Sequence, residues 1–264
     1  SAFEHDLEQR GFKVVNYTKS NYNATVYSMA SLFNMGYIKL SAKDLVTQRD
    51  MLLCRSIINN NNVGSFFKKL GYSLHNHSFF AFQGKKKAVN NFYFHPKSRI
   101  LTFETFVNRF MKDAGFNFFS KKKKEAVEKN DWLNDEIMDS LTKKTAAEKI
   151  NKPKFVYTHF TRPHHPYFVD RNGLPPVVAD SLKGFARIQK DYTEHLLYTN
   201  NRLLQLIDHI LTKSAIPPVI LLAGDHGFRQ FSKETDQKYY FMNLCAVYLP
   251  GGNYSGFYDG LSPV

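Results

Sequence analysis

An aspartate and a histidine stand side by side between two glycines, in Gly224-Asp225-His226-Gly227, directly after the apolar run 219–223. A carboxylate oxygen and an imidazole nitrogen are both good ligands for a divalent cation. The pair therefore predicts part of a metal site at the end of a buried strand. The alternative is that Asp225 caps a turn and His226 is an ordinary loop residue.

Thr25 precedes a segment with helical spacing of apolar residues, 26–37. A hydroxyl at the start of a helix faces the positive end of the helix dipole, which suits an anionic group such as phosphate. A threonine alcohol is a poor nucleophile near neutral pH, but a bound metal favours its alkoxide. The ordinary alternative is that Thr25 is a helix N-cap.

A third polar cluster follows the apolar segment 154–158. It carries His159, Arg162, His164 and His165 within seven residues, interleaved with prolines. A loop rich in cations and donors can hold the non-bridging oxygens of a phosphoryl group, or a second metal. We therefore predict that His159 and Arg162 bind substrate. The alternative is a rigid proline turn with exposed imidazoles.

Helices and apolar strands alternate along the chain, which predicts an α/β sandwich with a largely parallel sheet. Ligands bind beyond the carboxyl ends of the strands in such sheets, where all three clusters would lie. The expected strands are 12–17, one beginning at 72–74, 154–158, 219–223 and 244–249; the expected helices are 26–37, 62–70, 103–113, surface helices within 121–150, and 181–213. The run 219–223 has the continuous apolar character of a strand buried on both faces.

Composition narrows the class of protein. The chain has 264 residues, 43% of them hydrophobic and 15% aromatic, which excludes intrinsic disorder. Its longest apolar run is far shorter than the ~20 residues of a membrane span, and its first residues do not resemble a signal peptide. Two cysteines make no disulfide scaffold. The net charge of +13 fits nucleic acid, an anionic membrane surface or a phosphorylated substrate.

Taken together, three segments resemble the alkaline phosphatase superfamily, and within it the sulfatase-like phosphoethanolamine and phosphoglycerol transferases of the lipoteichoic-acid-synthase type. Residues 25–33 resemble the nucleophile segment of phosphoethanolamine transferases, His164-His165-Pro166-Tyr167 after His159 resembles the family's paired-histidine segment, and residues 224–227 resemble its Asp-His-Gly metal motif. The order and approximate spacing agree. The resemblance covers nearly the whole chain, with little specificity between about residues 40 and 150.

The resemblance implies a three-layer sandwich with a mostly parallel central sheet and a phospho-alcohol transfer or phosphodiester cleavage. Thr25 would be the nucleophile and form a covalent phosphothreonine. Thr25, Asp225 and His226 would hold a divalent cation, zinc or manganese, with calcium and magnesium as alternatives. His164 and His165 would contact the transferred group, His164 having the better spacing. The substrate would be an anionic phosphate or sulfate ester, with a lipid or a glycan as the carrier.

Two departures from the family pattern lead to further expectations. The family has another acidic metal ligand on a strand before the nucleophile, but only 24 residues precede Thr25, and Glu4, Asp6 and Glu8 lie on an expected helix. No histidine follows His226, which argues against two metals. Residues 1–264 are therefore expected to form a single sulfatase-like domain lacking its first strand and C-terminal end. We expect a membrane-tethered, extracytoplasmic protein, anchored by segments outside this chain, whose fragment holds metal weakly.

A different class of function also fits the composition. The chain could be a non-catalytic basic module that binds an anionic glycan, a lipid headgroup or nucleic acid on the same scaffold. Nucleic acid is not an expected partner of the enzyme. Metal analysis and a salt series of polyanion binding distinguish the two, since steep salt dependence without metal dependence favours the module.

Overall fold

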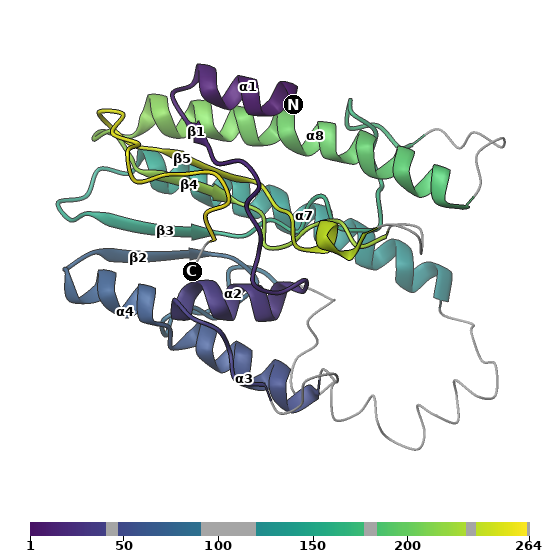
Figure 1. The fold of residues 1–264 in the computed structure, drawn as a ribbon, viewed down its shortest axis with the longest axis horizontal. Coiled ribbons are helices and arrows are strands. Elements are labelled where there is room, and N and C mark those ends of the chain that lie inside the picture. The colour runs from purple at the N-terminus through teal and green to yellow at the C-terminus, as the bar shows by residue number, and fades with distance from the viewer. Residues whose placement is uncertain (41–46, 91–119, 177–183, 231–235, 263–264) are drawn as a thin grey trace.

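The computed structural model describes residues 1–40, 47–90, 120–176, 184–230 and 236–262, and for 120–131 it describes the backbone only. Helices and strands alternate in it (Figure 1). The elements are α1 (Ala2–Gln9), β1 (Lys13–Val14), α2 (Thr25–Asn34), α3 (Gln48–Asn59), α4 (Asn62–Lys69), β2 (Ser73–His77), α7 (Ser120–Ala147), β3 (Lys154–Thr158), α8 (Gly184–Lys213), β4 (Ile220–Ala223), a 3-10 helix (Gln237–Tyr240) and β5 (Cys245–Tyr248). The predicted mixed α/β class is confirmed. The predicted helix 103–113 lies outside the described residues.

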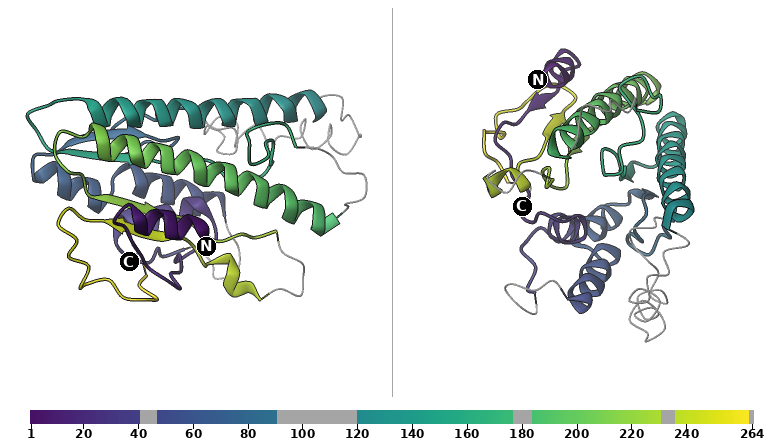
Figure 2. Two further views of the ribbon diagram at one scale, coloured as in Figure 1. Left: turned by 90° about the horizontal axis from the view of Figure 1, so that it is seen from above. Right: turned by 90° about the vertical axis from the view of Figure 1, so that its right-hand side faces the viewer.

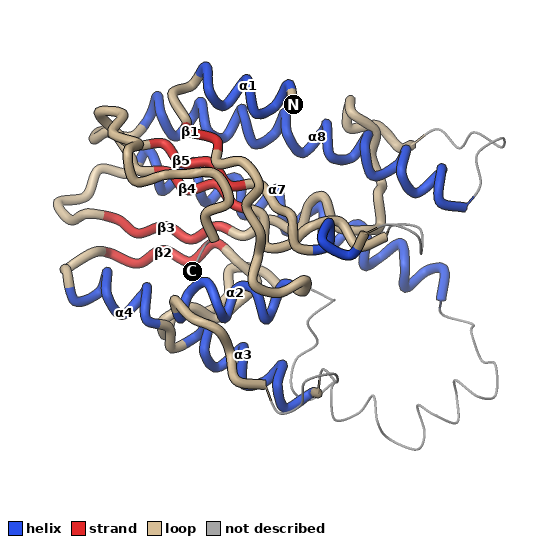
Figure 3. The backbone as a smooth tube through the Cα atoms, viewed as in Figure 1, coloured by secondary structure: helices blue, strands red, loops and turns tan. Residues whose placement is uncertain are grey.

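The described strands form two small sheets. In the first, β5 lies between β1 and β4 and pairs antiparallel with both; in the second, β2 and β3 are parallel, with Ser73 opposite Lys154 and His77 opposite Thr158. Figure 3 shows the strands following one another in the order β2, β3, β4, β5, β1. No ladder joins β3 to β4 in the described part of the chain.

The expectation that β4 is a parallel strand buried on both faces is wrong. It pairs antiparallel with β5, and the side chain of Leu221 is 60% exposed. Ile220 and Leu222 pack in the cluster that includes Leu203 of α8, so this helix covers one face of the strand only. An apolar run indicates which residues can be buried, but it does not indicate how many of its faces are covered.

The two long helices α7 and α8 run side by side along one side of the molecule (Figure 2). α7 contacts β2 and β3, whereas α2, α3 and α4 pack together below these strands in the view of Figure 1. No helix of the described residues is both long enough and apolar enough to cross a membrane.

The buried apolar side chains gather in two clusters among the described residues. The first joins α2, α3 and β3 around Phe82, whose ring contacts those of Phe33 (4.9 Å between centroids) and Tyr157 (5.2 Å). The second joins α1, β1, β4, β5 and α8 around Leu7 and Ile207. Helix α2 contributes side chains to the first cluster and β4 to the second.

Several boundaries differ from the sequence-based expectation for local reasons. The strand expected over 12–17 is shortened to two residues, since Tyr17 adopts a positive φ of 57° and is exposed. The first predicted helix ends at Asn34, because Met35 takes the left-handed conformation. The predicted helix 62–70 is confirmed over Asn62–Lys69, with Gly71 at φ 83°. Helix α3, which begins with a Thr47–Asp50 capping box, was not predicted.

Candidate functional site

Three segment ends meet at one place: the start of α2, the end of β3 and the turn after β4. Thr25 is the first residue of α2, and its side-chain hydroxyl lies close enough to the carboxylate of Asp225 to lower the pKa of that carboxyl. These two residues are 200 positions apart in the sequence. One turn further along the helix, Ser28 Oγ donates to the backbone oxygen of Asp225 at 2.5 Å. The hydrogen bond of Ser28 therefore holds the start of α2 against the turn after β4.

The N-cap interpretation of Thr25 is wrong. The cap residue is Ala24, in an extended conformation and without a side-chain hydrogen bond to the helix. The Thr25 hydroxyl lies near the Asp225 carboxylate, and Thr25 is not the residue that caps its helix. It lies at the positive end of the helix dipole, as predicted.

Asp225 and His226 present their ligand atoms to the same space. Asp225 Oδ1 accepts the backbone N–H of His226 at 3.0 Å, and Asp225 Oδ2 lies 3.5 Å from His226 Nε2. His226 Nδ1 donates to the backbone oxygen of Gly227 at 2.8 Å, so in the neutral ring Nε2 carries the lone pair. Two ligand atoms of a tetrahedral zinc site are separated by about 3.4 Å, given bonds of about 2.1 Å. The spacing of Oδ2 and Nε2 fits one shared cation.

Gly227 is required for this turn. Its N–H donates to the backbone oxygen of Tyr240 at 2.8 Å, and a Cβ at this position would overlap the backbone oxygens of Tyr239 and Met242. The glycine therefore allows the turn after β4 to pack directly against the segment around the 3-10 helix. This close approach fixes the backbone to which His226 Nδ1 is bonded.

The carboxyl of Asp225 is held in its ionised form. Burial alone would raise its pKa, but His226, His159 and the Thr25 hydroxyl outweigh burial and leave the pKa below its ordinary value. Burial lowers the pKa of His159, and the nearby Asp225 opposes this shift. The ionised Asp225 carboxylate therefore lies in one site with the buried His159 imidazole.

His159 belongs to this site through the end of β3. Its Nδ1 lies 3.0 Å from the Tyr157 hydroxyl, and its ring packs edge-on against Phe79 at 4.9 Å between centroids. The electrostatic influence of Asp225 and His226 on its pKa places it beside them. Tyr157 and Ser28 were missed by the sequence reasoning. The only sequence signal for either residue is its position. Tyr157 lies two residues before His159, and Ser28 lies one helical turn after Thr25.

His164 and His165 lie on exposed parts of the His/Pro loop. His164 Nδ1 donates to the backbone oxygen of His165 at 2.5 Å. Desolvation and the neighbouring charges of Arg229 and His226 lower the pKa of His164. The ring of His165 packs edge-on against Tyr167 at 5.4 Å between centroids. His164 therefore lies within the electrostatic influence of His226.

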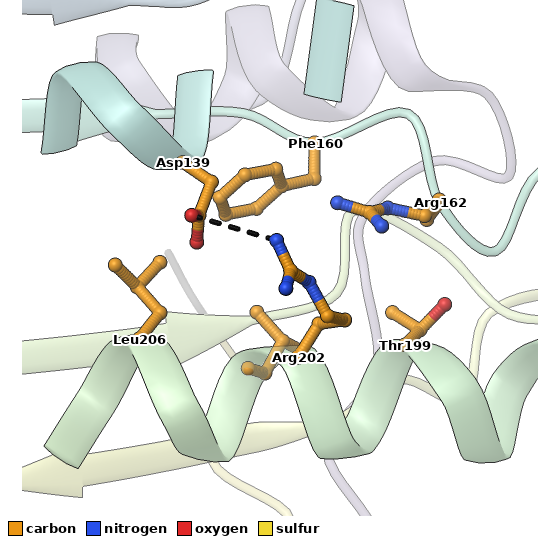
Figure 4. A pocket seen from close by; sticks show the side chains of 7 residues that line it. Asp139, Phe160, Arg162, Thr199, Arg202 and Leu206 are labelled. Carbon is orange, nitrogen blue, oxygen red and sulfur yellow. Dashed lines mark ion pairs between the residues drawn. The ribbon is translucent and has the colours of Figure 1, made fainter. Parts of the chain in front are cut away.

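Arg162 lines a pocket with Asp139 of α7 and Arg202 of α8, which form an ion pair with each other (Figure 4). Its Nε lies 2.9 Å from Asp135 Oδ2 and its Nη1 lies 3.2 Å from Glu136 Oε1, and its side chain is only 5% exposed. Asp135 also accepts the backbone N–H groups of Thr161 (2.7 Å) and Arg162 (3.0 Å). These contacts anchor the His/Pro loop. The structure does not bring the guanidinium together with Thr25 and Asp225, so substrate binding by Arg162 stays a prediction.

The donor set fits a divalent cation in part. Asp225, His226 and the Thr25 hydroxyl supply three donors, and structural and catalytic zinc sites have about four ligands in all. The part of the chain with described side chains contains no group of three or more His, Cys, Asp or Glu residues arranged to hold a metal. Glu4 and Glu8 lie on helix α1, as predicted.

No family model, no curated protein and no solved structure matches this chain. The interpretation of the site therefore rests on its geometry and on the motifs of the sequence.

Proposed function

We propose that this chain is a sulfatase-like catalytic domain of the alkaline phosphatase superfamily, a metal-dependent hydrolase or transferase of phosphate or sulfate esters. The observation that carries the proposal is the proximity of the Thr25 hydroxyl to the Asp225 carboxylate, at a point where Ser28 Oγ of the same helix donates to the backbone oxygen of Asp225. It joins the proposed nucleophile to the proposed metal motif across 200 positions of sequence. In this proposal the five strands belong to one central sheet between two helical layers.

Each residue of the site has a specific role in the proposed reaction. Thr25 Oγ attacks the phosphorus or sulfur, an O–P or O–S bond forms to threonine, and the bond to the leaving alcohol breaks. The proton lost by the Thr25 hydroxyl ends on the oxygen of the leaving alcohol, so the step consumes Thr–OH and the ester and releases the alcohol. A divalent cation held by Thr25, Asp225 and His226 would lower the pKa of the hydroxyl and offset negative charge on the ester.

The imidazoles would stabilise the transferred group. In this proposal His164 and His165 would contact the non-bridging oxygens, and His159 would contribute from the end of β3; because His164 Nδ1 already donates to the backbone oxygen of His165, its Nε2 would donate only in the protonated ring. Water or an acceptor alcohol then takes the group from Thr25 and releases the hydroxyl. We infer an anionic ester substrate, on a lipid or a glycan, at the outer face of a membrane to which segments outside this chain tether the protein.

The test compares three variants with the unchanged protein. Hydrolysis of bis(p-nitrophenyl) phosphate is measured with zinc or manganese added. Thr25→Ala should abolish turnover, Thr25→Ser should retain part of it, and Ser28→Ala, which removes only the contact to the Asp225 backbone, should retain most of it. Turnover by Thr25→Ala above about one tenth of the unchanged rate would exclude Thr25 as the nucleophile.

Metal binding is measured separately by calorimetry with zinc. Asp225→Asn and His226→Gln should each weaken binding about 10-fold or more, since each removes one of few ligands. Zinc binding that neither variant affects would contradict the proposed site. Polyanion binding that falls steeply with salt, in the absence of any metal dependence, would instead support the basic binding module.

A further inference from the structure

Arg229 follows the proposed metal motif, three residues after His226. It is exposed, and it forms no ion pair with a carboxylate of the described residues. The arginines between residues 159 and 213 differ in this respect, because each is paired: Arg162 with Asp135, Arg171 with Glu194, Arg187 with Asp191 and Arg202 with Glu136. The guanidinium of Arg229 therefore remains available to an anion from outside the chain.

The two neighbours of Arg229 in the sequence are held against aromatic side chains. The Phe228 ring packs on Tyr192 of α8 at 4.2 Å between centroids, and the Tyr167 hydroxyl donates to Gln230 Oε1 at 2.7 Å. The rings of Tyr167 and Tyr192 also contact each other, at 5.6 Å between centroids. The backbone of Arg229 is thus fixed from both sides, beside the His/Pro loop to which Tyr167 belongs.

Arg229 lies at the border of the candidate site. Three residues of chain span at most about 11 Å, so the backbone of Arg229 cannot lie far from that of His226. Burial lowers the pKa of His164 most, and the nearby charges of Arg229 and His226 lower it further. His164 is therefore an electrostatic neighbour of both residues. The guanidinium and the proposed metal ligand approach the same imidazole.

The site needs a positive charge of this kind if its substrate is an anion. Asp225 is ionised and repels an anionic ester. Because its pKa is lowered, His164 is mostly neutral near pH 7 and supplies little positive charge. A guanidinium stays charged, and its planar set of N–H donors matches two oxygens of a phosphate.

We propose that Arg229 is a substrate-binding residue that holds the non-bridging oxygens of the phosphoryl or sulfuryl group. This inference rests on the proposed function of the site. It gives Arg229 the role that the sequence pattern suggested for Arg162, whose guanidinium is paired with Asp135 and Glu136. An exposed arginine fixed by its neighbours can meet an incoming anion without first breaking an ion pair.

The first measurement is a phosphorus NMR titration of inorganic phosphate without added metal, which requires no turnover. The unchanged protein should bind phosphate, and Arg229→Gln should weaken binding about 10-fold or more, because charge-assisted hydrogen bonds are lost. Arg229→Lys keeps the charge but loses the paired donors, so it should weaken binding by a smaller factor.

The matched control is Lys213→Gln, which removes one exposed positive charge at the last residue of α8. This residue precedes β4, whereas Arg229 follows it, so the two charges belong to opposite ends of the strand. The control should bind phosphate within about 2-fold of the unchanged protein. Equal loss in Lys213→Gln and Arg229→Gln would overturn the proposal, because net charge alone would then explain binding. Absence of phosphate binding by the unchanged protein would overturn it too.

The second measurement is hydrolysis of bis(p-nitrophenyl) phosphate with manganese added. Arg229→Gln should lower kcat/KM about 10-fold or more, and Lys213→Gln should leave it within about 2-fold. Turnover that Arg229→Gln leaves unaffected would overturn this inference while the proposed function stands. Phosphate binding that depends on Arg229, in a protein that hydrolyses no ester, would support the anion site and refute the proposed function.

Discussion

Replacing Asp135 by asparagine should destabilise the protein through the loop that carries the site histidines. Asp135 and Arg162 are 1% and 5% exposed in their side chains, and they form an ion pair at 2.9 Å. Asparagine keeps the volume and one amide acceptor, but it leaves the guanidinium without its buried partner. Removing one member of a buried ion pair costs about 3–5 kcal/mol. Since Glu136 remains 3.2 Å from Arg162, we expect about 3 kcal/mol.

The free energy of unfolding is measured by urea denaturation, and the midpoint temperature of thermal unfolding is measured by heating. At this chain length, about 3 kcal/mol corresponds to a fall in the midpoint of roughly 6–12 °C. The control is Glu136→Gln, because Glu136 also contacts Arg162 but is 32% exposed in its side chain. It should cost less than about 1 kcal/mol. A cost below about 1 kcal/mol for Asp135→Asn, or equal costs for the two variants, would refute the claim that burial makes this pair an anchor.

Three further outcomes follow from buried groups. The free energy of unfolding should fall as pH drops from about 6.5 toward 4, because burial lowers the pKa of His77 and His195 to about 4 and the unfolded chain then binds protons that the folded chain does not; urea titrations at pH 7 and pH 4.5 that agree would contradict this. Burial raises the pKa of the fully buried Cys54 thiol to about 11, so in the folded protein Cys54 should react with a thiol reagent more slowly than the half-buried Cys245. Denaturation should remove this difference, and equal rates in the folded protein would contradict the burial of Cys54. Phe82→Ala should cost about 3–5 kcal/mol of stability in the same urea assay, and a cost under about 1 kcal/mol would show that the first apolar cluster can collapse around the gap.

The meeting of Thr25 with Asp225 and His226 could be predicted from the sequence. Each follows or begins an element with clear apolar spacing, and the ends of such elements collect at one edge of an α/β sheet. His159 could be placed there by the same rule. This part of the prediction needed only local patterns and the alternation of helices and strands.

The partners of Arg162 and the exposure of β4 could not be predicted. Asp135 lies in a polar, lysine-rich helix in which no local pattern distinguishes one carboxylate from another. A basic residue in a loop that also carries histidines therefore resembled a substrate ligand. For β4, the apolar run is equally compatible with a parallel or an antiparallel neighbour. Strand direction depends on pairing between distant segments, which a local pattern does not encode.

The position of the site between the two apolar clusters has a thermodynamic consequence. Thr25 is attached to the first cluster through α2, and Asp225 to the second through β4. Any molecule or ion that binds both residues would connect the two apolar clusters, which have no side chain in common among the described residues. A ligand bound at this site should then raise the temperature at which the chain unfolds, and the size of the rise should depend on the concentration of the ligand and on its affinity. Melting curves recorded over a series of ligand concentrations would thus measure how strongly a bound ligand connects the two apolar clusters.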